Sequence, residues 1–147
     1  VYRSDEDYPP NFWNKYNARK LSLRLSGGTP CLDFGVSIWN AAENRLDYFI
    51  GIATEEAKGD LSGTQELTIP GGLYAVFQTP VTTHADFVNT IHRTWEYINE
   101  VWFRQSSYER KCGPEFECYQ EQSRAFTERI YIPVARKAKT ENWRKKS

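Results

Sequence analysis

The chain has 147 residues, which is the size of a single domain with a hydrophobic core of its own. Its 19 basic and 19 acidic side chains cancel, so no overall charge attracts nucleic acid, and contact with DNA would require a separate domain. No apolar run approaches the roughly 20 residues that cross a bilayer, and no signal-peptide pattern is present, which argues against a membrane partner.

The cysteines and histidines are few and scattered. Cys31, Cys112 and Cys118 form no CxxC pair, and an odd, sparse count is typical of a reducing cytoplasm. With His84 and His92 as the only histidines, a zinc site is not expected. We therefore expect a cytoplasmic protein without a metal or another cofactor.

Aromatic residues are unusually frequent. The chain contains eight Phe, nine Tyr and five Trp, and no Met, which is more aromatic area than a core of this size requires. Aromatic rings bring apolar surface, and Tyr and Trp add a polar group, so the composition indicates a pocket for flat ligands.

The first half of the chain, about residues 1–54, predicts a helix and a hairpin. Pro9-Pro10 is typical of a first helical turn, and Phe12, Trp13 and Tyr16 then share one face. Strands are predicted at Cys31–Asn40 and Leu46–Ala53, joined by a polar turn. Residues 55–64 are a charged connector that ends this half.

The second half, 65–135, predicts three strands and a long helix. Gln65–Thr79 reads as a strand interrupted at Pro70-Gly71-Gly72. A helix is expected from about His84 to Arg104, where Thr83 and Asp86 resemble a capping box. Strands are expected at Tyr108–Tyr119 and Glu128–Val134, followed by a basic tail at 136–147.

The two halves form a weak internal repeat. Leu46–Ala53 overlays Glu128–Ala135 at an offset of 82. Two strand–helix–strand–strand units would join into one antiparallel sheet with two helices on one face and a central ligand pocket, an α+β fold. No good strand is visible before Pro9, so either the first strand is missing or residues 1–8 supply a poor one.

The order of segments in the second half resembles a known family. Glu66–Phe77, Gly113–Tyr119 and Ile130–Val134 resemble the GyrI-like effector-binding domain, the ligand-sensing part of AraC/Rob-type and BmrR-type regulators that is also found as a stand-alone protein. The resemblance implies a pocket for small hydrophobic or cationic molecules, including multidrug binding in transcription regulation.

Candidate pocket residues follow from the repeat and from this resemblance. Trp13, Trp95 and Trp102 could reach the pocket from the helices, and Phe49 and Tyr131 from equivalent strands. For Trp102, a place in the ordinary core is the alternative. Trp39 could form either a pocket wall or an exposed rim.

The position of a pocket acid is the main open question. The family usually has a glutamate directly before the Ile/Leu-Tyr-Ile-Pro segment, but here Arg129 occupies that position and Glu128 comes one residue earlier. A shift of one residue on a strand moves a side chain to the other face. Glu128 therefore does not simply inherit the role, and Asp47, at the equivalent position of the first half, is the better candidate for a pocket acid. The alternative is that Asp47 forms an ion pair with Arg129.

Two further glutamates match the family without an expected ligand role. Glu115 and Glu117, in Gly-Pro-Glu-Phe-Glu, are expected to serve the turn and the strand entry.

Non-catalytic ligand binding is the predicted function, by a regulator's sensor domain or a free-standing module. Because the chain begins at Val1, a DNA-binding domain could precede it. No catalytic triad is discernible, but a hydrolase of the same fold is an alternative, with Glu128 or Asp47 as general base and Tyr131 as hydrogen-bond donor. A protein-inhibitory module is a third, and an exposed sheet edge could support a homodimer.

Overall fold

One antiparallel sheet forms the frame of the molecule. The computed structural model describes residues 1–122 and 125–138. The strands lie in the order β1-β3-β2-β6-β7-β4, with β5 also paired to β7. Their bounds are β1 Tyr2–Arg3, β2 Asp33–Asn40, β3 Arg45–Gly51, β4 Tyr74–Gln78, β5 Tyr108–Arg110, β6 Glu115–Gln122 and β7 Ala125–Arg136. The α+β class and the single antiparallel sheet are confirmed.

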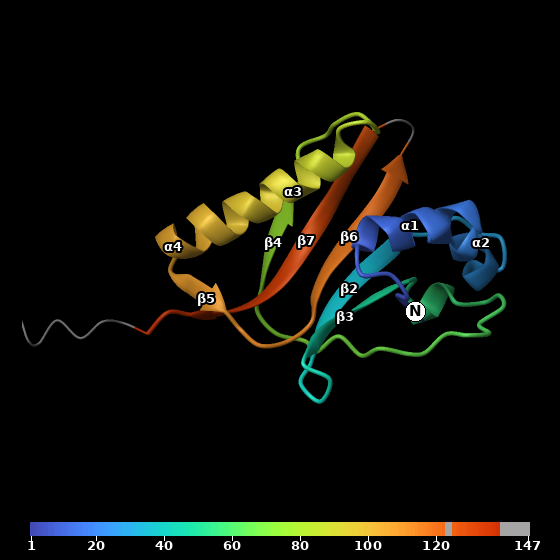
Figure 1. The fold of residues 1–147 in the computed structure, drawn as a ribbon, viewed down its shortest axis with the longest axis horizontal. Coiled ribbons are helices and arrows are strands. Elements are labelled where there is room, and N and C mark those ends of the chain that lie inside the picture. Colours follow the sequence, from blue (N-terminus) through green and yellow to red (C-terminus); the bar gives the residue numbers. More distant parts are fainter. Residues whose placement is uncertain (123–124, 139–147) are drawn as a thin grey trace, which may run out of the picture.

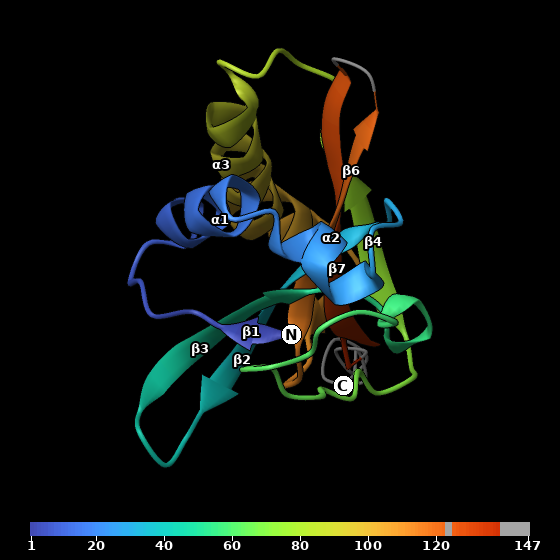
Figure 2. The same ribbon diagram turned by 90° about the vertical axis from the view of Figure 1, so that its right-hand side faces the viewer.

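The helices pack on the sheet in two groups. α1 and α3 lie on the same side of the sheet, each over its own half (Figures 1 and 2). The first group is α1 Pro9–Ala18 and α2 Leu21–Ser26; the second is a continuous segment of α3 Phe87–Tyr97, a π-helical turn η2 Ile98–Trp102, and α4 Phe103–Gln105. A short 3₁₀ helix, η1 Thr54–Glu56, follows β3. The sequence pattern did not predict α2.

Both halves of the chain pair their strands in the same order. In the first half β1 pairs with β3 and β3 with β2, and in the second β4 pairs with β7 and β7 with β6. Residues 1–8 thus supply a strand of two residues, with Tyr2 opposite Ile50. The two halves meet where β2 pairs with β6, at the middle of the sheet.

The predicted strand at Gln65–Thr79 is wrong in its first part. Residues 65–73 form no strand, and β4 begins only at Tyr74. Pro70 has no N–H for a strand ladder, and Gly72 has a φ of 155° that few other residues adopt. The connector instead extends along the sheet face opposite α1 and α3, where Leu67 and Ile69 line a cavity of about 490 Å³ with Phe34 of β2.

The long helix and the strand after it also differ from prediction. The helix begins at Phe87, and the Asp86 side chain makes no capping hydrogen bond, so the predicted capping box does not form. The predicted strand Tyr108–Tyr119 is two strands, because Gly113, with a φ of 153°, lies in the break between β5 and β6. Most of the predicted basic tail, residues 139–147, lies outside the described residues.

Two separate cores hold the two halves. The first contains Phe12, Tyr16, Leu25, Ile50 and Ile52, and the second contains Ile98, Ile130, Ile132 and Val134. α1 therefore packs on β3, and the α3–η2 segment packs on β7. Neither helix group covers the middle of the sheet, and this leaves space between them.

A glycine joins the connector to α2. A Cβ on Gly59 would lie 2.0 Å from the Arg24 carbonyl oxygen and 2.5 Å from the Gly27 nitrogen, both of which are backbone atoms. The Gly59 N–H also donates to the Leu25 carbonyl at 2.8 Å. We expect Gly59→Ala to lower the free energy of unfolding by about 1–3 kcal/mol through overpacking, as measured by urea denaturation. Gly71→Ala is the matched control, because a Cβ there meets nothing within 4 Å; equal losses in both variants would contradict this reasoning.

Candidate functional site: an aromatic cavity with an acidic floor

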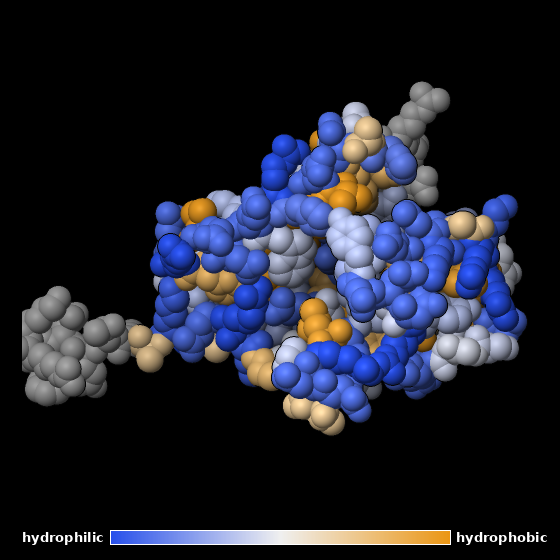
Figure 3. Space-filling model, in the orientation of Figure 1, coloured by the Kyte–Doolittle hydropathy of each residue, from blue (hydrophilic) through white to orange (hydrophobic). Residues whose placement is uncertain are grey.

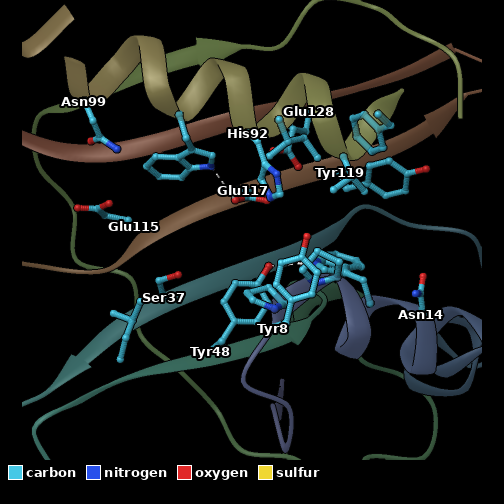
Figure 4. Close-up of a pocket in the computed structure, with 18 of the residues that line it drawn as sticks. Tyr8, Asn14, Ser37, Tyr48, His92, Asn99, Glu115, Glu117, Tyr119 and Glu128 are labelled. Carbon is cyan, nitrogen blue, oxygen red and sulfur yellow. Dashed lines mark hydrogen bonds between the residues drawn. The ribbon is translucent and has the colours of Figure 1, made fainter. Parts of the chain in front are cut away.

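A cavity of about 930 Å³ occupies the space between α1 and α3. Its floor is the middle of the sheet, and side chains from both helix groups form its walls (Figure 4). In the space-filling view, apolar side chains appear between the two helix groups on a face that is mostly hydrophilic (Figure 3). The volume lies at the upper end of the range for small-molecule sites.

Aromatic rings line one wall and one end of the cavity. Trp13 of α1 donates a hydrogen bond from Nε1 to the Tyr48 hydroxyl at 2.8 Å, and its ring meets that of Tyr119 edge-on, with the centroids 6.0 Å apart. Phe87 of α3 lies 5.4 Å from Tyr119 and 5.8 Å from Phe126, centroid to centroid. Flat apolar surfaces of this kind suit an aromatic or lipophilic ligand.

A glycine on β2 makes room for this wall. A Cβ on Gly35 would lie 2.0 Å from the Tyr48 hydroxyl oxygen and 3.1 Å from the Trp13 ring. Tyr48 can therefore lie across β2 and reach Trp13 only because position 35 has no side chain.

Two glutamates lie together on the floor. Glu117 of β6 and Glu128 of β7 both line the cavity. The register places Glu117 opposite Ile130 and Glu128 opposite Tyr119, so both carboxyls lie on the helix-covered face of adjacent strands. The two carboxyls share a hydrogen bond. The Trp95 indole donates a second one from Nε1 to Glu117 Oε1 at 3.2 Å.

The surroundings of the two carboxyls differ. Glu128 is only 4% exposed, and its Oε1 is buried without a hydrogen-bond partner. Glu117 keeps part of its surface open to the cavity. None of the ion pairs among the described residues involves either glutamate. The floor therefore holds buried acid that forms no ion pair with a described basic side chain.

Burial changes the acidity of the whole group. It raises the pKa of Glu128 well above its usual range, and the adjacent Glu117 raises it further. Burial also raises the pKa of Glu117, opposed by hydrogen bonds from Glu128 and Trp95 and by the proximity of His92. Burial and Glu117 raise the pKa of the Tyr48 phenol, which therefore stays neutral. Two carboxyls this close and this buried do not both ionise at neutral pH.

Four of the predicted ligand-binding residues line the cavity: Trp13, Trp39, Trp95 and Glu128. Trp39 lies at the rim, 54% exposed, opposite Leu46, which is 60% exposed. The structure thus brings together tryptophans from both helix groups and one of the two predicted acids.

Asp47 does not line the cavity, because it points to the opposite face of the sheet. It pairs in register with Ile38, one residue out of phase with the cavity-lining Ser37–Tyr48 pair. Its carboxylate bonds with Arg3, Arg45 and Asn40. The alternative ion pair of Asp47 with Arg129 is not formed, since β2 and β6 separate their strands.

The other three predicted residues also lie elsewhere. Phe49 pairs with Val36 and Tyr131 with Phe116 on the face away from the helices, where the Tyr131 and Phe116 rings stack 4.6 Å apart. Trp102 packs edge-on against Phe77, with the centroids 4.9 Å apart, as part of the second core. Tyr131 alternates with Ile130 and Ile132 along the chain, but alternation alone does not tell which face of the sheet the helices cover.

Several cavity residues were not predicted from the sequence, and Glu117 is the most important of them for the charge of the floor. It was assigned to the strand entry together with Glu115, but both line the cavity. One signal was available: Glu115, Glu117 and Tyr119 alternate with Phe116 and Cys118, which makes one face of this strand polar. A polar strand face at the middle of a sheet indicates a cavity rather than a core.

Two helix groups on one sheet enclose the cavity, which is the arrangement expected of an effector-binding domain. The model of the Cass2 family, described as integron-associated effector binding protein, matches residues 2–134. The chain therefore belongs to this GyrI-like effector-binding family, and the resemblance seen in the sequence is confirmed. A comparison with curated proteins found no match. Within residues 1–122 and 125–138, no helix has the length and apolar character needed to cross a membrane.

Proposed function

We propose that the protein binds a small, largely apolar cation in the cavity between α1 and α3. The ligand's aromatic or aliphatic body lies against the rings of Trp13, Trp95 and Tyr119, and its positive charge lies near Glu117. The observation that carries this proposal is the pair of buried glutamates that take part in no ion pair among the described residues.

Physical chemistry favours a cation at this place. A negative charge that is shielded from water attracts a cation much more strongly than an exposed one. Aromatic faces around the charge add cation–π attraction. A polar or anionic ligand would have neither contribution and would lose hydration on entering.

The cavity also sets the size of the ligand. A volume of about 930 Å³ accommodates a molecule of several fused or linked rings. Because aromatic rings from both helix groups and from the sheet contribute to the wall, the site would accept varied apolar shapes. We propose that this breadth, of the multidrug-binding kind, serves either the sensor of an AraC-type transcription regulator or a free-standing cytoplasmic binding module.

Tryptophan fluorescence and thermal shift test the proposal. Methyltriphenylphosphonium is titrated beside neutral triphenylphosphine oxide, which has a similar size and shape. We expect saturable quenching and stabilisation by the cation, with weaker effects of the neutral compound. Equal responses to both compounds would mean an aromatic slot without charge selection, and no response to either would reject ligand binding here.

Glu117→Gln tests which acid attracts the cation. The substitution removes the charge and keeps the shape, so we expect the affinity for the phosphonium to fall by about tenfold or more, measured by calorimetry at pH 7.5. The affinity for the neutral oxide should not change.

Asp47→Asn is the matched control, because Asp47 lies on the opposite face of the sheet. We expect this variant to bind the cation like the wild-type protein. A loss of cation affinity in Asp47→Asn with no loss in Glu117→Gln would mean that Asp47, and not Glu117, attracts the cation.

The hydrolytic alternative has no support from the geometry of its named residues. It required Tyr131 to donate a hydrogen bond at a site whose base is Glu128 or Asp47. Glu128 lies on the helix-covered face, whereas Tyr131 and Asp47 lie on the opposite face. Glu128 and Tyr131 therefore do not form one site, and the strands β2 and β6 separate Asp47 on β3 from Tyr131 on β7.

A further inference from the structure

The cavity floor contains two glutamates, although one negative charge is enough to attract a ligand with a single positive charge. Both carboxyls are buried on adjacent strands and bond to each other, and no described basic side chain forms an ion pair with either. One proton shared between them relieves their repulsion, and the contacts of each carboxyl decide which of them keeps it.

The contacts that stabilise a charge all belong to Glu117. The Trp95 indole donates to its Oε1 at 3.2 Å, and part of its surface is open to the cavity. His92 is near enough to favour its charged form. A carboxylate with an indole donor, a nearby imidazole and an open cavity beside it can stay ionised.

Glu128 has the opposite surroundings. It is 4% exposed, and its Oε1 has no hydrogen-bond partner. The Thr79 hydroxyl, which is nearby, accepts from the Glu128 backbone N–H at 2.9 Å and does not stabilise the carboxyl. An ionised group without donors in such a place is costly, whereas a neutral carboxylic acid can donate its proton to Glu117.

We infer that the two glutamates divide the work: Glu128 holds a proton and donates it to Glu117, and Glu117 alone presents the negative charge to the ligand. Glu128 is then a positioning residue that acts through Glu117. This assignment deepens the proposed function, and its account of the ligand rests on that function. In the empty cavity the floor carries one negative charge and one fixed proton, which matches a ligand with a single positive charge.

Other titratable groups face the pair from the surrounding elements. They are Tyr8 before α1, Tyr48 on β3, His92 on α3 and Tyr119 on β6. Arg110, Lys111 and Glu115 line the cavity near β5, where Arg110 Nε pairs with Glu115 Oε2 at 2.7 Å. Because His92 faces the pair from α3, binding experiments against pH use a variant without it.

Infrared spectroscopy of the ligand-free protein tests where the proton is. At pH 7 exposed carboxyls are ionised, so a buried carboxylic acid shows its own C=O stretching band. We expect this band in the wild-type protein and in Glu117→Gln, and its loss in Glu128→Gln. Glu115→Gln is the matched control, since Glu115 also lines the cavity but is paired with Arg110, and it should keep the band. A band lost in Glu117→Gln and kept in Glu128→Gln would overturn the assignment, as would its absence from the wild-type protein.

Cation binding gives a second, independent test. The amide introduced by Glu128→Gln can replace the acid as a donor, so this variant should bind methyltriphenylphosphonium within about threefold of the wild-type affinity. Glu128→Leu removes the donor and raises the pKa of Glu117. In a His92→Gln background, Glu128→Leu should therefore lose its cation affinity at a higher pH than Glu128→Gln does, as the pH is lowered.

Two results would contradict the division of roles. One is a Glu128→Gln variant that binds the cation as weakly as Glu117→Gln, and the other is identical pH profiles for the Gln and Leu variants. If no variant binds the cation while the infrared pattern holds, the proposed function fails and the location of the proton stands.

Discussion

Glu128→Gln is expected to stabilise the folded protein at neutral pH, by about 3 kcal/mol at pH 7. Burial and the adjacent Glu117 raise the pKa of Glu128 in the folded state far above its ordinary value of 4.5. In the unfolded chain the carboxyl ionises near its ordinary pKa, so the wild-type protein must take up a proton to fold. A glutamine keeps the neutral, hydrogen-bonding shape and avoids that cost.

The sign of the pH dependence follows from the raised pKa. Glu128 contributes its full stability below about pH 4, where it is protonated in both states, and this contribution is lost as the pH rises towards the folded-state pKa. The gain from Glu128→Gln should thus be close to zero at pH 4 and increase through pH 5 to 8. Urea denaturation at several pH values measures it.

Asp47→Asn provides a control of opposite sign. Hydrogen bonds from Asn40 and Arg45 lower the pKa of Asp47, so its contribution is present above the unfolded pKa and is lost as the pH falls. We expect Asp47→Asn to destabilise the protein at pH 7 and to have no effect in acid. A Glu128→Gln gain that does not depend on pH would show that Glu128 is ionised in the folded state.

Trp102→Ala is expected to lower the free energy of unfolding by about 3 kcal/mol. The Trp102 ring lies edge-on to Phe77 and Phe103, at 4.9 and 5.0 Å, and stacks on Tyr108 at 6.3 Å. Truncation leaves a cavity in the second core and removes these ring contacts. Denaturant unfolding followed by circular dichroism measures the loss.

The same position separates a core residue from a ligand contact. Because Trp102 does not line the cavity, Trp102→Phe should keep the cation affinity of the wild-type protein while losing part of the stability. Trp95→Phe is the matched comparison: it removes the donor to Glu117 Oε1 and should weaken cation binding. A Trp102→Phe variant that is stable but binds the cation weakly would mean that Trp102 is a ligand contact.

Local patterns were informative for α1 and for the chemistry of the cavity. Pro9-Pro10 marked the start of α1, as observed, because proline fits the first helical turn without losing a hydrogen bond. The excess of aromatic residues indicated a pocket, and Trp13 and Trp95 do line one. These features depend on near neighbours in the chain, which a sequence displays directly.

Which acidic side chains lie in the cavity could be determined only from the tertiary structure. Alternation places Asp47 and Glu117 each on a definite face of its strand. It does not tell which face of the sheet the helices cover. Glu128 has the same parity as Ile130 and Ile132, and the structure places all three on the helix-covered side of β7. Glu117 is eleven positions earlier, and only the pairing of β6 with β7 brings it to Glu128.

The sequence by itself determined the family, the α+β class, the antiparallel sheet and the aromatic character of the site, since composition, periodicity and motif order carry this information. Only the tertiary structure decided that two glutamates meet on the floor, that Asp47 lies on the other face, and that Trp102 belongs to the core. The physical reason is that burial, strand register and the packing of each helix group on its own half of the sheet arise between segments far apart in the chain. The pKa of a carboxyl depends on those surroundings more than on its sequence neighbours.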